Sequence, residues 1–229
     1  MAATVKGKWF DRIVLIIFEN TNYTDAIANS YLKEITTRPN GVLLSDYHAV
    51  EHPSEPNYIA QIAGSTYGIL DDENYDIDDE TLVDLLEKKG VSWKVVNAKR
   101  LDDDIKNNQV PQLVYYVPNQ NNDAHDTNIS YASAWFKTWL EPKLKMSSFT
   151  HKTLFFTVFD ESANDNDTVN HIYASLLGDP VTKHNNHNDT THYTHYSFLR
   201  TVEDNWDLGS LNRNDSSATP FSLYLNEQD

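Results

Sequence analysis

Three things are missing from this 229-residue sequence: cysteine, long apolar runs and an excess of basic side chains. Without cysteine, no disulfide constrains the chain and thiol chemistry is excluded. No run of about 18 apolar residues occurs, so we expect no membrane span. The net charge of −16 repels nucleic-acid phosphates and anionic lipids, so neither is an expected partner.

The composition is that of a folded globule, with 39% apolar and 12% aromatic residues. A chain of this length can bury one sizeable core, so we expect a single domain over residues 1–229. The first residues lack the apolar core of a signal peptide, which fits either a cytosolic protein or a mature form without its leader. Oligomeric state is left open.

Apolar runs at residues 13–18 and 154–159 are typical of strands buried on both faces. Further strands are expected at 41–50, 91–96, 113–117 and 172–177, and helices at 81–89, around 135–140 and at 192–208, with another helix running through residues 27–32. Strands alternating with helices predict an α/β layered fold.

Each of the two apolar runs ends in an acid-bearing pair, Glu19-Asn20 and Asp160-Glu161. Ligands of open α/β sheets bind at the carboxyl ends of strands, so these pairs are expected to converge. Crowded carboxylates are costly unless a cation neutralises them, which indicates a divalent metal bound mainly by oxygen. The alternative is that each pair simply begins a solvated loop.

Ser54 precedes a short predicted helix that has Pro56 in its first turn and ends at Gly64. Free N–H groups and the positive end of the helix dipole would point toward the Ser54 hydroxyl, a suitable place for a serine that carries phosphate. The alternative reading is that Ser54 is only a helix N-cap.

Histidines in two other segments of the chain are candidates for the same site. His125 belongs to a polar loop at 121–127 and could bind metal or phosphate, or else form an ordinary loop hydrogen bond. His192 and His195 begin the helix predicted at 192–208, so their imidazoles could face the same edge, although His192 could equally be a surface residue.

Five short motifs in order resemble the phosphoesterase family, which holds fungal acid phosphatases and bacterial phospholipase C-type enzymes. They are Phe18-Glu19-Asn20, His52-Pro53-Ser54-Glu55-Pro56-Asn57, Asn122-Asp123-Ala124-His125-Asp126, Phe159-Asp160-Glu161 and Tyr193-Thr194-His195-Tyr196-Ser197. The resemblance runs from about residue 13 to residue 213. It implies a three-layer sandwich like that of alkaline phosphatase, with a mostly parallel central sheet and helices on both faces.

The resemblance also implies roles for individual residues. Ser54 matches the family's nucleophile, which attacks phosphorus and touches the metal. Glu19, Asn20, Asp160 and Glu161 match the metal ligands. Asp123, His125 and His195 match positions that hold either a second metal or the phosphate, and His52 matches a position beside the nucleophile with a less defined role.

The expected reaction is hydrolysis of a phosphomonoester through a phosphoserine at Ser54, as in an acid phosphatase. Metal coordination would favour the alkoxide of a weak nucleophile, and His125 and His195, if protonated, would supply positive charge or protonate the leaving alcohol. The oxygen-rich ligand set suits Mg, Ca or Mn, whereas a second ion at Asp123, His125 and His195 would point to Zn.

Two other readings are kept open: a phosphodiesterase or phospholipase C-type enzyme with a wider, more apolar pocket, and a catalytically silent binding protein of the same fold. Longer fungal members carry an insert after the strand that matches residues 91–96, and this chain instead runs from Lys99-Arg100 straight into Leu101. The missing insert puts substrate specificity in doubt.

Asn-X-Ser/Thr sequons occur at Asn22, Asn128, Asn166, Asn188 and Asn214. They favour a secreted or cell-wall-associated glycoprotein, although a chain rich in Asn and Thr also produces sequons by chance.

Overall fold

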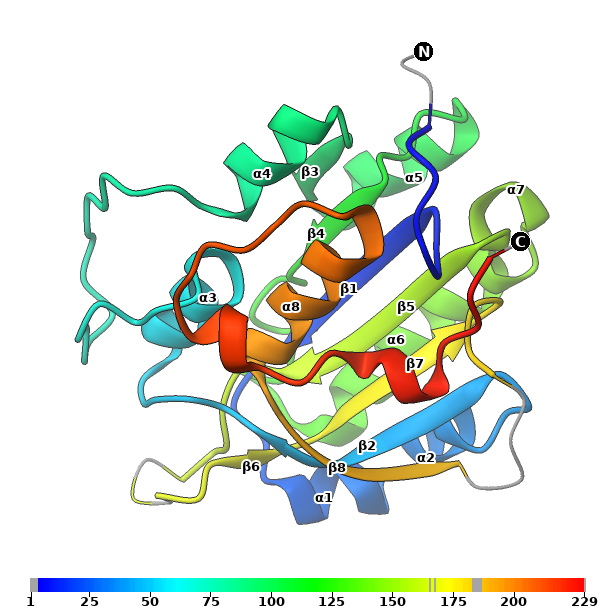
Figure 1. Ribbon diagram of the computed structural model, residues 1–229. Helices are drawn as coiled ribbons and strands as arrows, with labels where there is room; N and C mark the ends of the chain where they lie inside the picture. Colours follow the sequence, from blue (N-terminus) through cyan, green and yellow to red (C-terminus); the bar gives the residue numbers. More distant parts are fainter. Residues whose placement is uncertain (1–3, 165, 167, 183–186, 229) are drawn as a thin grey trace.

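A computed structural model describes residues 4–164, 166, 168–182 and 187–228 and is built around one eight-stranded sheet (Figure 1). The strand order is β3-β4-β1-β5-β7-β2-β6, and β8 pairs with β2. The strands are β1 (Arg12–Phe18), β2 (Gly41–His48), β3 (Trp93–Val96), β4 (Leu113–Tyr116), β5 (Thr153–Phe159), β6 (His171–Ile172), β7 (Ala174–Gly178) and β8 (Asn188–Thr194).

Most of these strands run in the same direction. β3, β4, β1 and β5 are paired in parallel, and β2 is parallel to β8. β7 lies antiparallel between β5 and β2, so β2 and β8 also point the same way as β5, and only β6 and β7 are reversed. The expected mostly parallel sheet is therefore confirmed, and its reversed strands make it a mixed sheet.

Helices cover both faces of the sheet, with α8 in front and α6 behind in Figure 1. Phe198 of α8 stacks on Phe156 of β5 with ring centroids 5.8 Å apart, and Phe136 of α6 meets Phe18 of β1 at 5.1 Å. Burial of these aromatic rings supplies much of the apolar stabilisation. The helices are α1 (Tyr23–Ala28), α2 (Ser30–Thr36), α3 (Ser54–Ala63), α4 (Leu82–Lys89), α5 (Ala98–Lys106), α6 (Ile129–Leu144), α7 (Ser147–Thr150), α8 (His195–Trp206), and the 3₁₀ turns η1 (Asn214–Ser217) and η2 (Phe221–Tyr224).

The helix predicted at 192–208 is wrong at its start, because residues up to Thr194 form strand β8. β8 pairs in parallel with β2, which places His192 opposite Asp46. The chain turns into α8 only after Thr194, whose backbone N–H donates to Ser197 Oγ at 3.1 Å in a capping box. Tertiary pairing has overridden the helical pattern of the polar residues before His195.

Two other predicted elements are divided in the structure. The helix expected through residues 27–32 is split into α1 and α2 at Asn29, whose side-chain oxygen accepts from Tyr31 N and Leu32 N. The strand expected at 172–177 is split into β6 and β7, and both are antiparallel to β2.

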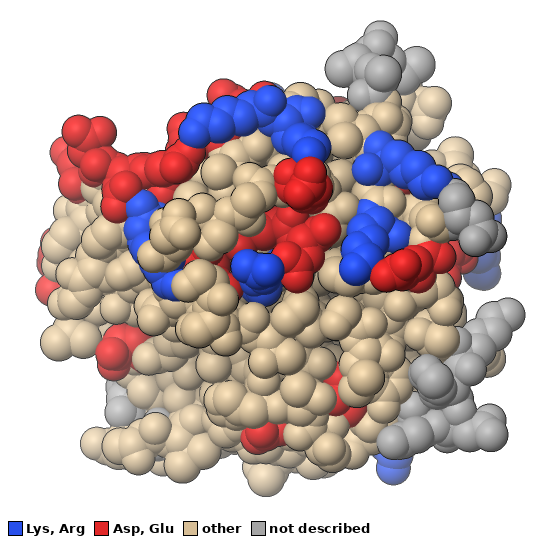
Figure 2. All heavy atoms as spheres, viewed as in Figure 1, with Lys and Arg blue, Asp and Glu red and all other residues tan. Residues whose placement is uncertain are grey.

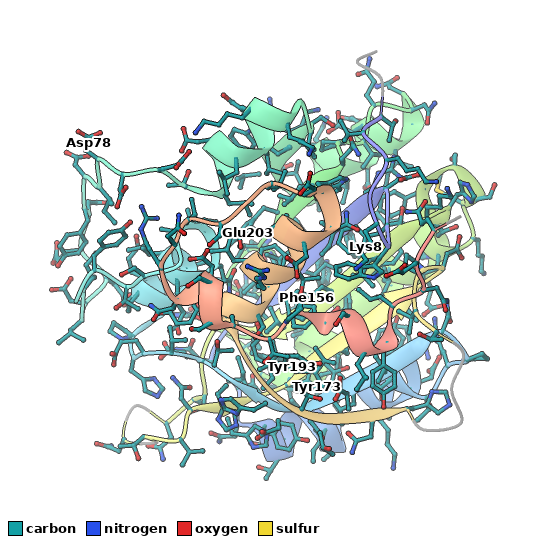
Figure 3. All side chains as sticks on the ribbon, viewed as in Figure 1. Lys8, Asp78, Phe156, Tyr173, Tyr193 and Glu203 are labelled. Atoms are coloured by element: carbon teal, nitrogen blue, oxygen red, sulfur yellow. The ribbon has the colours of Figure 1, made fainter. Side chains whose placement is uncertain are left out.

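A buried pair of carboxyl groups joins α8 to η1. Glu203 is 1% exposed and Asp215 is fully buried, and both accept from the backbone N–H of Leu211, at 3.3 and 2.9 Å. Burial, reinforced by the negative charge of Asp215, raises the pKa of Glu203 to about 8. Glu203, which Figure 3 labels on α8, therefore holds a proton at neutral pH.

This pair predicts a pH-dependent stability. Because the pKa of Glu203 is raised in the folded state, its contribution is fully present below its ordinary pKa and is lost as pH rises through about 8. The unfolding free energy of Glu203→Gln relative to that of the wild type should therefore increase between pH 5 and 8. The slope of this increase is at most about 1.4 kcal/mol per pH unit. Urea titrations at several pH values measure this difference, with the exposed Glu227→Gln as the control. An equal difference at pH 5 and pH 8 would contradict the assignment.

Candidate active site

The two acid-bearing pairs lie side by side because the strands that carry them are neighbours. Phe18 of β1 is in register with Phe159 of β5, so Glu19-Asn20 and Asp160-Glu161 leave the sheet at the same edge. Asn20 N donates to Asp160 Oδ1 at 3.2 Å, and Asp160 N donates to Phe18 O at 2.9 Å. Asp160 and Glu161 are buried, at 0% and 1% exposure. We call Glu19, Asn20, Asp160 and Glu161 the acidic cluster.

Ser54 reaches this cluster as the first residue of α3. Its hydroxyl donates to Glu161 Oε1 at 3.0 Å and lies 3.5 Å from Glu19 Oε2. The preceding loop is held by the buried Asn57, whose Oδ1 accepts from Val50 N and whose Nδ2 donates to Pro53 O. The structure thus brings the predicted nucleophile and the predicted metal ligands together, and Asn57 fixes the loop that presents Ser54.

The carboxylates of the cluster receive contacts from a tyrosine and a histidine. Tyr58 OH donates to Glu19 Oε1, and His52 Nδ1 contacts Glu161 Oε2. His52, expected beside the nucleophile, thus contacts a carboxylate of the cluster. No role is expected for Tyr58 from the sequence, yet it stands one helical turn after Ser54. The i, i+4 spacing of Ser54 and Tyr58 is the signal that would have placed both on one face of α3.

His195 lies behind the cluster with both ring nitrogens engaged. Its Nε2 is 2.6 Å from the backbone oxygen of Asp160, and its Nδ1 is 3.1 Å from Gln61 Nε2. The first contact requires a donor and the second an acceptor, so the ring is neutral and protonated on Nε2. Complete burial lowers the pKa of His195 to about 4. This placement does not favour the expected imidazolium that contacts substrate, because the ring is buried against the backbone of Asp160.

Asp123 and His125 belong to a tight loop joined to the first strand. Glu19 N donates to Asp123 O at 2.9 Å, and His125 N donates to Asp123 Oδ1 at 2.9 Å. Ala124 between them has a φ of 92°, a strained conformation for a residue with a side chain. Burial raises the pKa of Asp123 to about 6, while the hydrogen bond from His125 Nδ1 to Asp126 Oδ1, at 2.8 Å, raises the pKa of the exposed His125.

The start of α3 offers fewer free backbone donors than the sequence predicts. Pro56 has no N–H, and Glu55 N donates to Asp72 Oδ1 at 2.9 Å. Asp72 belongs to an acidic segment between α3 and α4 that stands out in Figure 2 and contains Asp71, Asp72, Glu73, Asp76, Asp78, Asp79 and Glu80. Figure 3 labels Asp78 at the far end of this segment. An anion near Ser54 would therefore compete with a carboxylate for the helix terminus.

The acidic cluster has the chemistry of a site for a divalent cation. Asn20 Oδ1 and Asp160 Oδ2 are buried and accept no hydrogen bond, although buried polar atoms normally find a partner. Burial and the charge of Glu19 raise the pKa of Asp160 well above its ordinary value when no cation is present. A divalent ion would satisfy both oxygen atoms and offset the crowded negative charge, so these residues fit such an ion.

Two hollows border the residues around Ser54. A polar hollow of about 440 Å³ is lined by Asn20, Ala124 and Asn128, among others. A smaller hollow of about 230 Å³ is lined by Glu55 and Tyr58 of α3 and by Leu86, Trp93 and Tyr115, with further apolar side chains. The part of a substrate beyond the acidic cluster could therefore occupy either a polar or an apolar hollow.

The fold is similar to that of solved proteins from the alkaline phosphatase superfamily. A Vibrio parahaemolyticus crystal structure described as a protein of the alkaline phosphatase superfamily matches with a TM-score of 0.67 at 12% identity, over 94% of this chain and 71% of that one. The zinc complex of the C-terminal periplasmic domain of EptC from Escherichia coli matches with a TM-score of 0.52 at 10% identity, over 89% and 84% of the two chains. At these identities the likeness concerns the fold alone.

Sequence comparison gives the family: the chain belongs to the Phosphoesterase family, whose model matches residues 95–209. An Aspergillus fumigatus protein named acid phosphatase is 30% identical over 98% of this chain, and a Penicillium chrysogenum phosphate-repressible acid phosphatase is 31% identical over 96%. The chain spans 61% and 65% of the lengths of these two relatives. The aligned stretches run over 277 and 273 residues, more than this chain contains, so the relatives carry insertions relative to it.

Proposed function

We propose that this chain is a metal-dependent phosphoric-ester hydrolase that acts on phosphomonoesters through a phosphoserine at Ser54. The observation that carries the proposal is the position of Ser54 Oγ, 3.0 Å from Glu161 and 3.5 Å from Glu19, beside the unpartnered oxygens of Asn20 and Asp160. The names of the fungal relatives, which are acid phosphatases, support the same activity.

Glu19, Asn20, Ser54, Asp160 and Glu161 would hold the metal, and their oxygen donors suit Mg, Ca or Mn, with Zn as the ion seen in a protein of this fold. When bound, the ion would favour the ionised form of the Ser54 hydroxyl and offset the charge of the phosphoryl group. Tyr58 and His52 orient Glu19 and Glu161, and His195 holds the backbone of Asp160.

The reaction has two displacements at phosphorus. Ser54 Oγ releases its proton to solvent and bonds to phosphorus, the ester P–O bond breaks, and the departing alkoxide takes a proton from His125 Nε2. A water molecule then gives a proton back to His125 and attacks phosphorus, which breaks the Oγ–P bond and releases phosphate. Ser54 Oγ takes a proton from solvent, which restores the starting state. Because Nδ1 of His125 is hydrogen-bonded to Asp126, Nε2 is the nitrogen that faces substrate in this scheme. Asp123 holds the His125 loop against Glu19, and in this proposal it contributes to phosphate binding by fixing that loop.

The pH dependence of turnover follows from His125. Its hydrogen bond to Asp126 raises its pKa, so the imidazolium form persists to higher pH than for an ordinary histidine. Turnover of a phosphomonoester should therefore be greatest below neutrality and fall as pH rises through the pKa of His125. Asp126→Asn should lower that pKa and move the alkaline limb of the pH–rate profile to lower pH.

The measurement is the initial rate with p-nitrophenyl phosphate from pH 4 to 9, with and without a chelator. His125→Ala should lower the rate at pH 5 by about 100-fold. The surface variant His151→Ala serves as the control. An alkaline optimum that depends on added zinc would instead support a second metal held by Asp123 and His125, and it would overturn the acid phosphatase assignment.

A phosphodiesterase or phospholipase C-type activity is the second candidate, and the apolar hollow beside Tyr58 and Tyr115 favours it. That hollow could accept the second, apolar substituent of a diester. The relative rates on p-nitrophenyl phosphate and bis(p-nitrophenyl) phosphate distinguish the two functions. We expect the monoester to be the better substrate, and a faster diester reaction would assign the second function.

The proposal also includes a secreted or cell-wall location for the protein. The five sequon asparagines, Asn22, Asn128, Asn166, Asn188 and Asn214, are all exposed, as N-glycosylation in a secreted or cell-wall-associated protein requires. Two of them have structural roles, because Asn128 Oδ1 caps α6 and Asn214 Nδ2 donates to Gly64 O. Among the described residues, no helix has the length and apolar character needed to cross a bilayer.

A further inference from the structure

A second group of metal-type ligands lies on strands β2 and β8, apart from the acidic cluster. Asp46 and His48 are two residues apart on β2, so both side chains lie on the same face of the sheet. His192 of β8 is in register with Asp46. One ligand atom from each of these three residues lies within 4.8 Å of the other two.

The distances within this group pair each carboxylate oxygen with one imidazole. Asp46 Oδ1 is 2.9 Å from His48 Nε2, and Asp46 Oδ2 is 3.1 Å from His192 Nδ1. The side chain of Asp46 is 43% exposed and that of His192 is 66% exposed, while His48 is 16% exposed. An ion from solvent can therefore reach the group without any opening of the fold.

The hydrogen bonds of His48 require a positive charge at its second nitrogen. His48 Nδ1 lies 2.8 Å from the backbone oxygen of Val169, which can only accept, so this nitrogen carries a proton. In a neutral ring, Nε2 would then direct its lone pair at the carboxylate of Asp46. Either a second proton or a metal ion must lie at Nε2 to make this contact favourable.

A backbone carbonyl that accepts from the far nitrogen is also the usual partner of a metal-bound histidine, because it fixes the tautomer and the ring. The ring of His48 is held further by stacking, with the His171 centroid 4.9 Å away and Tyr23 stacked on His171 at 3.7 Å. The ring of His192 is 5.0 Å from that of His48. The ligand nearest the core is therefore already oriented, and only exposed side chains must adjust.

We propose that Asp46, His48 and His192 bind a divalent transition-metal ion of the zinc class. Two imidazole nitrogens and one carboxylate are a set that zinc accepts, with a position left for water, whereas Mg and Ca prefer sites made of oxygen alone. This donor set contrasts with the oxygen-rich acidic cluster, so this site favours zinc over Mg and Ca more strongly than the acidic cluster does. Neither site shares a ligand with the other.

The ion would join the two strands that lead into the active site. β2 runs on into the loop that carries His52 and Ser54, and β8 is followed directly by His195. Within the described sheet β8 pairs with β2, so it depends on this one neighbour. A metal ion that bridges β2 and β8 would therefore fix both segments that lead to the active site. Its main effect would be to raise the stability of the folded chain.

The test is zinc titration by calorimetry at pH 7.5 on chelator-stripped protein that carries Asp160→Asn, which weakens the acidic cluster. We expect one zinc ion per chain in this background. His192→Ala should weaken the binding at least about 100-fold, because one of three ligands is lost, and His151→Ala should leave it unchanged. Cobalt gives a second readout, since a tetrahedral site with two imidazoles produces a visible absorption band that His192→Ala should abolish.

Because His192 is exposed and at a surface position, its replacement is not expected to unfold the chain, and circular dichroism checks this. Zinc binding that is identical in the His192→Ala and His151→Ala proteins would overturn the proposal. So would a parent protein that shows no saturable zinc binding, which would mean that Asp46 simply pairs with protonated histidines. Neither outcome depends on hydrolytic activity, so the proposal stands or falls separately from the proposed function.

Discussion

Replacing Ser54 with alanine is expected to lower turnover of a phosphomonoester by about 10³-fold or more, since the proposed reaction has no other nucleophile. The substitution removes a hydroxyl that lies 3.0 Å from Glu161 and 3.5 Å from Glu19. It leaves the loop intact because Asn57, not the Ser54 side chain, holds the backbone ahead of α3. The measurement is kcat with p-nitrophenyl phosphate at acidic pH.

The exposed Ser222→Ala variant is a matched control, because it makes the same chemical change in η2, outside the acidic cluster. Unfolding temperatures of both variants should lie close to that of the wild type. A Ser54→Ala protein that is folded and retains most of its turnover would show that Ser54 is not the nucleophile. Loss of activity together with loss of structure would call for Ser54→Gly as a second variant.

Replacing Asp160 with asparagine is expected to have opposite effects on the metal-free and the metal-loaded protein. Without metal, burial and Glu19 raise the pKa of Asp160, so a neutral amide removes a buried group that is costly to ionise and should raise the unfolding temperature. With metal, the wild type should gain about 2.7 kcal/mol at an ion concentration 100 times the dissociation constant, and the variant should gain far less. Turnover should fall by about 100-fold or more.

Thermal melts with chelator and with added Mg, Mn or Zn measure both effects, and Asp207→Asn, at a site whose side chain is 97% exposed, is the control. An Asp160→Asn protein that is stabilised by metal as much as the wild type would contradict the assignment of the acidic cluster. The added zinc must be compared in a His192→Ala background, because the Asp46, His48 and His192 site would also respond to it.

The central residues of the site could be predicted from the sequence because each is marked by its immediate sequence neighbours. Continuous apolar runs identify β1 and β5 as buried strands, and the polar residues directly after such strands leave the sheet at one edge. That reasoning leads to Glu19 and Asp160 without any long-range information. The helix after Ser54 was equally local, with Pro56 in its first turn and Gly64 in the left-handed conformation at its end.

The role of His195 could not be predicted in the same way. A histidine in the motif Tyr193-Thr194-His195 has no local feature that tells a buried neutral ring from an exposed cation. The difference comes from Gln61 and the Asp160 backbone, which contact it from α3 and from the end of β5. Its charge state is thus a property of the tertiary structure.

Strand β8 was missed for a related reason. Its sequence is polar, and only Asp189 and Tyr193 are buried along it, so no continuous apolar run marks it as a strand. Pairing with β2 supplies the hydrogen bonds that keep it extended. The same pairing creates the group of Asp46 and His192, whose members are far apart in the sequence and give no joint signal there.

The most direct test of the central claim is to trap the covalent intermediate. Metal-loaded protein is mixed with a phosphomonoester, quenched in acid after a few milliseconds, and digested for mass spectrometry. The account predicts phosphate on the peptide that carries Ser54, at a level that rises with substrate concentration and disappears in Ser54→Ala. Steady turnover without any phosphorylated Ser54, or phosphate on another residue, would contradict it.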